Sequence, residues 1–170
     1  MLNKPLLEAV GQLIVDWRPD VVVHIGDHFD MKSLSLYDFP KNNRQVFDGE
    51  EVEQDVKAGW AGMRYLLDSL REEPFWQRRH KKKVFQPEMH FTLGNHEQRV
   101  DRFNELKGLV NLPKELKGLG WEVHPFLKPI EIEGVHFVHY AYNAMSGKPI
   151  GGNAEYRLNK PQLSFEEGHE

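Results

Sequence analysis

A short apolar run that ends in a glycine and a carboxylate constrains this chain more than any other feature. Residues 21–25 (Val-Val-Val-His-Ile) follow the breaker pair Pro19-Asp20, and their β-branched side chains predict a short buried strand. Gly26 ends the run, and Asp27 is the first side chain beyond it. Because ligands of open α/β sheets bind just outside the carboxyl ends of the strands, Asp27 occupies a position suited to chemistry.

Two further apolar runs end in the same way. Residues 89–93 lead into residues 94–97 (Gly-Asn-His-Glu), and residues 135–138 lead into His139. Three predicted strands therefore end in an aspartate, an Asn-His pair and a histidine. Since the carboxyl ends of neighbouring strands form one edge of a sheet, we expect these side chains to converge.

The composition bounds the class of protein. A chain of 170 residues with 39% hydrophobic residues is long enough for a real core, so we predict a single domain over residues 1–170. The formal net charge of −4 gives no overall attraction to nucleic acid or to anionic membranes. The chain contains no cysteine, so disulfides and thiolate metal sites are excluded and any metal ligands are nitrogen or oxygen atoms.

The distribution of apolar residues argues against a membrane protein. No apolar run approaches the roughly 18 residues that a membrane span requires. The N-terminal segment is interrupted by Glu8, Gln12 and Asp16, which is not typical of a signal peptide. We therefore predict a cytoplasmic protein without a membrane partner.

A first helix is predicted over residues 4–17. Asn3 is a suitable N-cap, and Pro5 is tolerated in the first turn. Apolar residues recur through this segment at helical spacing, and we expect them to lie against a sheet. They are Leu6, Val10, Leu13, Ile14 and Trp17.

The remaining elements alternate helices and strands, which is typical of an α/β fold. Residues 31–47 are expected to be irregular, and a long helix is predicted from a capping box at Asp48 to about Pro74, followed by a loop over residues 75–87. A shorter helix is expected at residues 97–107. Strands are expected near residues 20–25, 88–93, 121–127, 129–133, 135–139 and 163–165.

The side chains at the strand ends suit a divalent metal centre. The Asp27 carboxylate can bridge two cations, Asn95 offers an amide oxygen, and His139 and His169 offer imidazole nitrogens. Such a mixed set of ligands suits Mn, Fe, Zn or Ni better than Ca. Two metal ions held in this way can activate a water and stabilise the attacking and leaving oxygens of a phosphoryl displacement.

His96 follows Asn95 and is not itself a predicted ligand. It is placed to protonate the leaving oxygen, and Glu97 is placed to orient His96 or to stabilise its charge. Asp30 is expected to make outer hydrogen bonds, and His28 is a candidate for contact with a phosphate. The candidate catalytic residues are Asp27, Asn95 and His96.

These motifs resemble, in the same order, those of the calcineurin-like metallophosphoesterase superfamily. The motifs are residues 26–30 (Gly-Asp-His-Phe-Asp), residues 94–97, His139 and the pair Gly168-His169. The resemblance extends from about Arg18 to His169 and implies a four-layer αββα sandwich with two divalent metal ions. It also implies that Asp27 bridges the metals, that the second metal is bound by Asn95, His139 and His169, and that His96 assists catalysis.

Two departures from the family pattern concern the first metal. The family's opening Asp-x-His motif has no counterpart, and its closing Gly-His-x-His motif stops after Glu170. We therefore expect an incomplete domain that lacks the first strand, holds one metal loosely and is poorly active by itself. Met31-Lys32 stands where serine/threonine protein phosphatases have Arg-Gly, which argues against that subfamily. Residues 145–152 are similar to those of phage-encoded members.

Simpler interpretations of these residues remain open. Asp27 could be a turn residue, Asn95 a helix cap and His139 a core histidine, with His136 as the alternative ligand if the strand register differs. The basic run at residues 78–83 is either a solvated loop or a nucleic-acid contact. Metal-dependent hydrolysis of phosphoester bonds is the leading function, with a phosphodiester, nucleotide or nucleic-acid substrate slightly favoured. The alternatives are a phosphomonoesterase and a non-catalytic scaffold on the same fold.

Overall fold

The computed structural model describes residues 2–35, 48–103, 106, 108–143, 148–150 and 165–167. It contains helices, a parallel strand pair and an antiparallel strand pair, so the predicted mixed α/β class is confirmed. The chain divides into two compact units. Unit 1 comprises Met1–Val22 and His28–Glu88, and unit 2 comprises Val23–Asp27 and Met89–Glu170. Within the described ranges, no helix is both long and apolar enough to cross a membrane.

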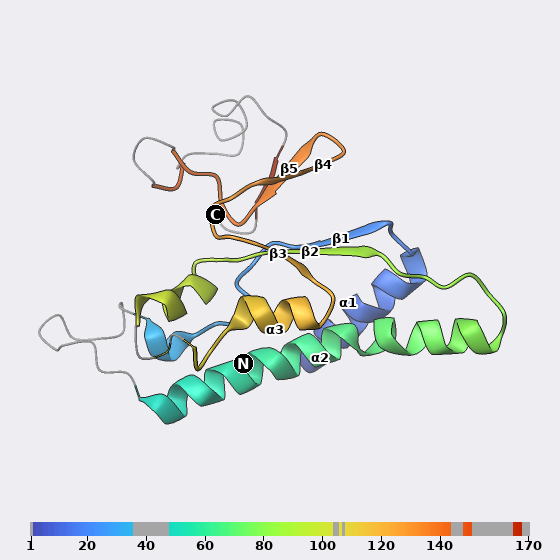
Figure 1. The fold of residues 1–170 in the computed structure, drawn as a ribbon, viewed down its shortest axis with the longest axis horizontal. Coiled ribbons are helices and arrows are strands. Elements are labelled where there is room, and N and C mark those ends of the chain that lie inside the picture. The colour runs from blue at the N-terminus through green and yellow to red at the C-terminus, as the bar shows by residue number, and fades with distance from the viewer. Residues whose placement is uncertain are drawn as a thin grey trace, which may run out of the picture. The chain divides into compact units, whose positions relative to one another are not determined.

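Unit 1 is built on two helices, α1 (Lys4–Trp17) and α2 (Gly49–Arg79), which lie against each other (Figure 1). The Asn3 side chain accepts a hydrogen bond from the Leu6 N–H and caps α1 as predicted. Gly11 allows the helices to approach closely, because a Cβ at this position would collide with the Leu66 carbonyl oxygen of α2. The contact is therefore made by backbone at this point.

The apolar face predicted for α1 is not the face that is buried. Gly11 and Val15 are the buried residues of this helix, whereas Trp17 is 77% exposed. The prediction that the apolar stripe lies against a sheet was wrong for four of its five members. The exposed members are Leu6, Val10, Leu13 and Trp17.

Helix α2 continues beyond Pro74 to Arg79, so the predicted helix end near Pro74 and the predicted loop from residue 75 were wrong. A polar network stabilises the additional turns. The buried Gln77 side chain donates to Glu73 (2.6 Å) and accepts from the Phe85 N–H (2.5 Å), while Arg18 pairs with Glu73 at 2.7 Å. A proline removes one helical hydrogen bond, and these contacts offset that loss.

Residues 32–34 form a short 3₁₀ helix, η1 (Lys32–Leu34), within a segment that the sequence predicted to be irregular. Asp55 of α2 accepts hydrogen bonds from the Ser33 N–H (2.8 Å) and hydroxyl (2.6 Å). Phe29 is fully buried against α2, where a Cβ on Gly59 would overlap its ring. These contacts anchor the segment that follows Asp27.

The described strands form two three-stranded sheets (Figure 1). The first has the order β1 (Val21–His24), β2 (Glu88–Thr92) and β3 (Glu122–His124), and β2 and β3 are parallel. The second has the order β4 (Ile130–Ile132), β5 (Val135–Val138) and β6 (Phe165–Glu167). Strand β4 is antiparallel to β5, and β6 is parallel to it.

Three elements of unit 2 differ from the prediction. The helix expected at residues 97–107 is a 3₁₀ helix over Glu97–Arg102, η2. Helix α3 (Leu112–Gly118), capped by the Asn111 side chain, was not predicted. The last strand is described at Phe165–Glu167, and residues 163–164 of the predicted strand lie outside the described residues. The other predicted strands are present but shorter.

Candidate metal centre

Asp27 occupies a tight turn directly after β1. Its φ is 54° and that of Gly26 is 90°, so two successive residues adopt the left-handed region. The Gly26 N–H donates to His24 Nδ1 at 3.2 Å, which helps to close the turn. A left-handed non-glycine residue is costly, and such strain is concentrated at functional sites.

Two glycines allow this turn to touch the loop after β2. A Cβ on Gly26 would lie 2.7 Å from the Gly94 nitrogen and 2.9 Å from His139 Nδ1. A Cβ on Gly94 would collide with Asp27 Oδ1. Both motifs therefore need glycine at these positions, because the backbones approach more closely than any side chain permits.

Glu97 links the turn after β1 to the loop after β2 through hydrogen bonds. Its buried carboxylate oxygen Oε2 accepts hydrogen bonds from the Asp27 N–H at 3.0 Å and from the Gly94 N–H at 2.8 Å. Asp27 Oδ1 in turn accepts from the His96 N–H at 3.0 Å. None of these three bonds uses the second carboxylate oxygen, Asp27 Oδ2, which is left for contacts with other side chains.

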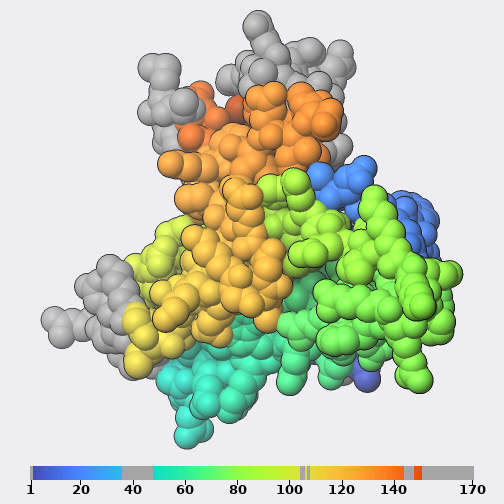
Figure 2. Space-filling model, turned by 45° about the vertical axis from the view of Figure 1, so that its right-hand side comes forward, coloured from blue at the N-terminus to red at the C-terminus, as the bar shows by residue number. Residues whose placement is uncertain are grey.

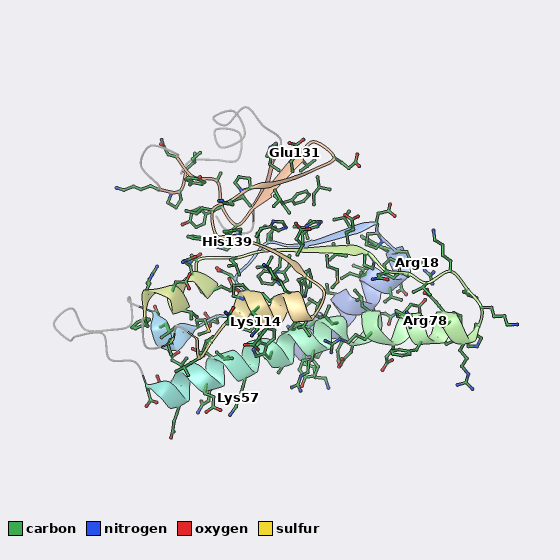
Figure 3. The ribbon with its side chains drawn as sticks, in the orientation of Figure 1. Arg18, Lys57, Arg78, Lys114, Glu131 and His139 are labelled. Atoms are coloured by element: carbon green, nitrogen blue, oxygen red, sulfur yellow. The ribbon has the colours of Figure 1, made fainter. Side chains whose placement is uncertain are left out.

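Side chains from three strand ends converge at Asp27 Oδ2. His139, labelled in Figure 3, is buried directly after β5, and its Nε2 lies 3.4 Å from Asp27 Oδ2 and 2.8 Å from Asn95 Oδ1. His96 Nε2 lies 3.7 Å from Asp27 Oδ2. The structure thus brings together Asp27, Asn95, His96, Glu97 and His139, all of which belong to unit 2.

The orientation of His139 defines what this cluster can bind. Its Nδ1 lies 2.8 Å from the Ile25 carbonyl oxygen, which accepts a hydrogen bond and therefore requires a proton on Nδ1. Nε2 then faces two oxygen acceptors, Asn95 Oδ1 and Asp27 Oδ2. In the imidazolium form of His139, Nε2–H can donate to these oxygens. In the neutral form, the Nε2 lone pair and the two oxygens are a donor set that can hold a divalent metal ion.

The directions in which the pKa values of Asp27 and His139 are shifted agree with this arrangement of hydrogen bonds. Burial alone would raise the pKa of Asp27, but hydrogen bonds from His139 and from the His96 N–H, with the charges of both imidazoles, hold it below its usual value. Burial alone would lower the pKa of His139, but its bonds to Asp27 and to the Ile25 carbonyl raise it. Each group therefore favours the charged form of the other.

Sequence reasoning missed a tyrosine near this cluster. Burial, followed by the negative charge of Asp27, raises the pKa of Tyr140, and the positive charge of Arg102 opposes that rise. Tyr140 directly follows His139, so its position beside a predicted ligand was the available signal. Its hydroxyl is protonated at neutral pH and is a hydrogen-bond donor near the carboxylate.

The remaining predicted site residues are His28, Asp30 and His169, with His136 as the alternative to His139. His28 belongs to unit 1, where its Nε2 lies 3.0 Å from the Gly59 carbonyl oxygen and burial lowers its pKa. Asp30 is exposed in the same unit. His169 lies outside the described residues. His136, the alternative to His139, lies with its Nε2 3.8 Å from Glu131 on β4.

A cavity of about 310 Å³ lies beside η2 in unit 2. Of the five clustered residues, only Glu97 lines it, and apolar side chains such as Leu93, Val100 and Leu112 form much of the wall. The donor atoms of Asp27, Asn95 and His139 are therefore not located in this cavity.

Replacing Gly94 with alanine is expected to separate the two loops, because the added methyl group would overlap Asp27 Oδ1 and crowd the Asp27 nitrogen. Overpacking of this kind costs about 1–3 kcal/mol of unfolding free energy. Urea denaturation and metal binding by equilibrium dialysis measure the effect. Gly118→Ala at the end of α3 is the control, since a Cβ there meets nothing within 4 Å. Equal stability and metal binding in both variants would contradict the proposed role of Gly94.

The metal-free protein is expected to show a His139 pKa above the ordinary value of 6.5. A raised pKa stabilises the fold below about pH 6.5, and this contribution is lost as the pH rises through the His139 value. The depressed pKa of Asp27 contributes above its ordinary value of 3.8 and is lost as the pH falls through the Asp27 value. An NMR titration of the imidazole protons measures the shift. Zn²⁺ should abolish the His139 titration, because metal and proton compete for Nε2.

Comparison of the chain with family models, with curated proteins and with solved structures found no match. What can be said about function therefore rests on the residues themselves and on their geometry.

Proposed function

We propose that the chain is a metal-dependent hydrolase of phosphoester bonds, built on the four-layer αββα sandwich of the calcineurin-like metallophosphoesterases. The mixed α/β architecture is compatible with that fold. The proposal rests on the ordered motifs in the sequence and on the placement of their side chains. Asp27, Asn95, His96 and His139 come from three separate loops and meet within hydrogen-bonding or ion-pair distances.

One observation supports the proposal most strongly. Asp27 Oδ2, Asn95 Oδ1 and His139 Nε2 face one another, and the Ile25 carbonyl directs the His139 lone pair toward the oxygens. An imidazole whose second nitrogen is held by a carbonyl is the usual arrangement of a metal-binding histidine. The donor set suits Mn, Fe, Zn or Ni, with Asp27 able to bridge two such ions. Bound divalent metal ions would supply water activation and charge neutralisation at the phosphoryl group.

The protein's own groups perform the other steps. Glu97 and the two glycines position the Asp27 carboxylate, which together with Asn95 and His139 would hold the divalent metal ions. His96 Nε2, close to the same carboxylate, donates a proton to the leaving oxygen. Tyr140 provides a further protonated hydroxyl for a phosphate oxygen.

We favour a phosphodiester substrate, with nucleic acid as one class. The exposed segment at residues 78–83 is Arg-Arg-His-Lys-Lys-Lys, and Arg78 at the end of α2 points away from the helix (Figure 3). Figure 2 shows this region, in green, at the surface of unit 1. Exposed cations of this kind attract a phosphate backbone in a manner that weakens with salt.

A substrate panel tests the proposal. We expect the chain with Mn²⁺ to hydrolyse an aryl phosphodiester slowly, but still faster than an aryl phosphomonoester, and to lose both activities when EDTA is present. A single-stranded oligonucleotide should be cleaved at low salt and more slowly at high salt. A faster reaction with the monoester would favour the phosphomonoesterase alternative. Metal binding without hydrolysis of any substrate would favour a non-catalytic scaffold.

A further inference from the structure

The pairing of β2 with β3 places a second group of metal-binding side chains on one face of the first sheet. His90 is paired with Glu122, and Thr92 is paired with His124, in a parallel register. Side chains two residues apart along a strand project from the same face. His90, Glu122 and His124 therefore share one face, with His90 opposite Glu122 and diagonal to His124.

The three side chains also meet at their ligand atoms. His90 Nδ1 lies 3.0 Å from His124 Nε2 and 3.6 Å from Glu122 Oε2, and His124 Nε2 lies 4.0 Å from Glu122 Oε1. One ligand atom from each residue can be chosen so that all lie within 4.8 Å of one another. In a tetrahedral site with metal–ligand bonds of about 2.0–2.2 Å, the ligand atoms are about 3.3–3.6 Å apart. The observed separations bracket this range.

We propose that His90, Glu122 and His124 form a metal site of their own, which binds Zn²⁺ or a related divalent transition metal. Two imidazole nitrogens and one carboxylate oxygen are a ligand set that zinc uses in proteins, and imidazole is a poor ligand for Ca²⁺ and Mg²⁺. The ligands lie on two hydrogen-bonded strands, so the backbone already holds them near the required geometry.

Solvent reaches this group from the carboxylate side. The histidine side chains are 13% and 16% exposed, whereas Glu122 is 68% exposed. The carboxylate can therefore move by the few tenths of an ångström that coordination requires. Three protein ligands leave the fourth position of a tetrahedral ion for water or a small anion. By joining β2 to β3, the ion would also stabilise the sheet.

This site shares no residue with the Asp27 centre, and the proposal does not depend on phosphoesterase activity. The test removes that centre first with the double variant Asp27→Asn/Asn95→Ala. Equilibrium dialysis against Zn²⁺ is expected to show about one bound ion per chain in this background. Adding His124→Gln should remove that ion.

His136 provides a matched control. It lies on β5 opposite Glu131 of β4, with 3.8 Å between His136 Nε2 and Glu131 Oε2, and the two side chains are 23% and 64% exposed. Among the described residues, no third metal-binding side chain joins this pair. His136→Gln in the same background should leave the bound ion in place. Equal loss of zinc in the His136 and His124 variants would overturn the proposal, as would retention of zinc in both.

A second variant covers the case in which His124→Gln disturbs the fold. Glu122 is mostly exposed, so Glu122→Gln in the same Asp27→Asn/Asn95→Ala background is expected to leave the folded structure intact. It should weaken Zn²⁺ binding roughly tenfold or more. The increase in Tm with added Zn²⁺ should shrink in parallel. An unchanged zinc affinity and an unchanged Tm increase in Glu122→Gln would exclude the site.

Discussion

His96→Asn is expected to lower the rate of phosphodiester hydrolysis by about 10²–10⁴, which is the usual contribution of a general acid or base. The metal content should stay near that of the wild type. The physical reason is that His96 Nε2 lies 3.7 Å from the shared carboxylate oxygen of Asp27, whereas Nε2 of His139 lies between that oxygen and Asn95. We therefore expect His96 to transfer a proton and not to be required to hold the metal.

The leaving group distinguishes proton transfer from binding. An alkoxide leaving group needs a proton, but a nitrophenolate does not, so the His96→Asn defect should be much smaller for the nitrophenyl substrate. His136→Asn on β5 is the control and should leave both rates unchanged. An equal loss with both leaving groups would show that His96 positions the phosphate instead of protonating the leaving oxygen.

Asp27→Asn is expected to weaken binding of divalent metal by more than about 100-fold, because even partners outside the ligand shell typically contribute 10–100-fold. The substitution removes the negative charge that His139 faces at 3.4 Å, while the size of the side chain stays the same. Asn95→Ala should also weaken binding, since it removes the oxygen 2.8 Å from His139 Nε2. Titration of the chain with Mn²⁺, followed by electron paramagnetic resonance of the free ion, measures both effects.

Asp101→Asn is the matched control for these variants. Asp101 is exposed on η2, and its described hydrogen bond is to the Gln98 side chain. It should bind metal as the wild type does. Unchanged Mn²⁺ affinity in both Asp27→Asn and Asn95→Ala would remove the two residues from the metal centre.

The convergence of Asp27, Asn95 and His139 could be predicted because strand ends are marked twice in the sequence, by an apolar run and by the glycine that ends it. The sequence indicated only part of the role of Glu97, because it predicted a contact with His96 and not the contacts with the two loops. Its described hydrogen bonds go to the Asp27 and Gly94 N–H groups, and such contacts depend on how closely two loops approach. The distance between two loops is set by the tertiary structure, and no local sequence pattern indicates it.

The helices show the other limit of sequence reasoning. Periodicity identified α1, but it selected the wrong buried face, because close helix packing at Gly11 depends on the partner and not on hydrophobicity alone. Pro74 predicted a helix end, yet the contacts of Gln77 with Glu73 and Phe85 stabilise further turns. In both cases tertiary contacts outweigh a local preference.

The group on β2 and β3 could not be predicted for a related reason. His90 and Glu122 are far apart in the sequence, and only the register of the strand pair places them opposite each other. A shift by one residue would move one of these side chains to the other face of the sheet. No role was therefore assigned to His90 or His124 from the sequence.

The most direct test of the proposed activity is the initial rate of aryl phosphodiester hydrolysis as a function of Mn²⁺ concentration, in the wild-type chain, in Asp27→Asn and in Asp101→Asn. We expect a low rate that rises with Mn²⁺ to a plateau in the wild type and in Asp101→Asn, and no metal-dependent rate in Asp27→Asn. If Asp27→Asn hydrolyses the substrate as fast as the wild type, or if the wild-type rate does not depend on Mn²⁺, then Asp27, Asn95 and His139 do not form a catalytic metal centre.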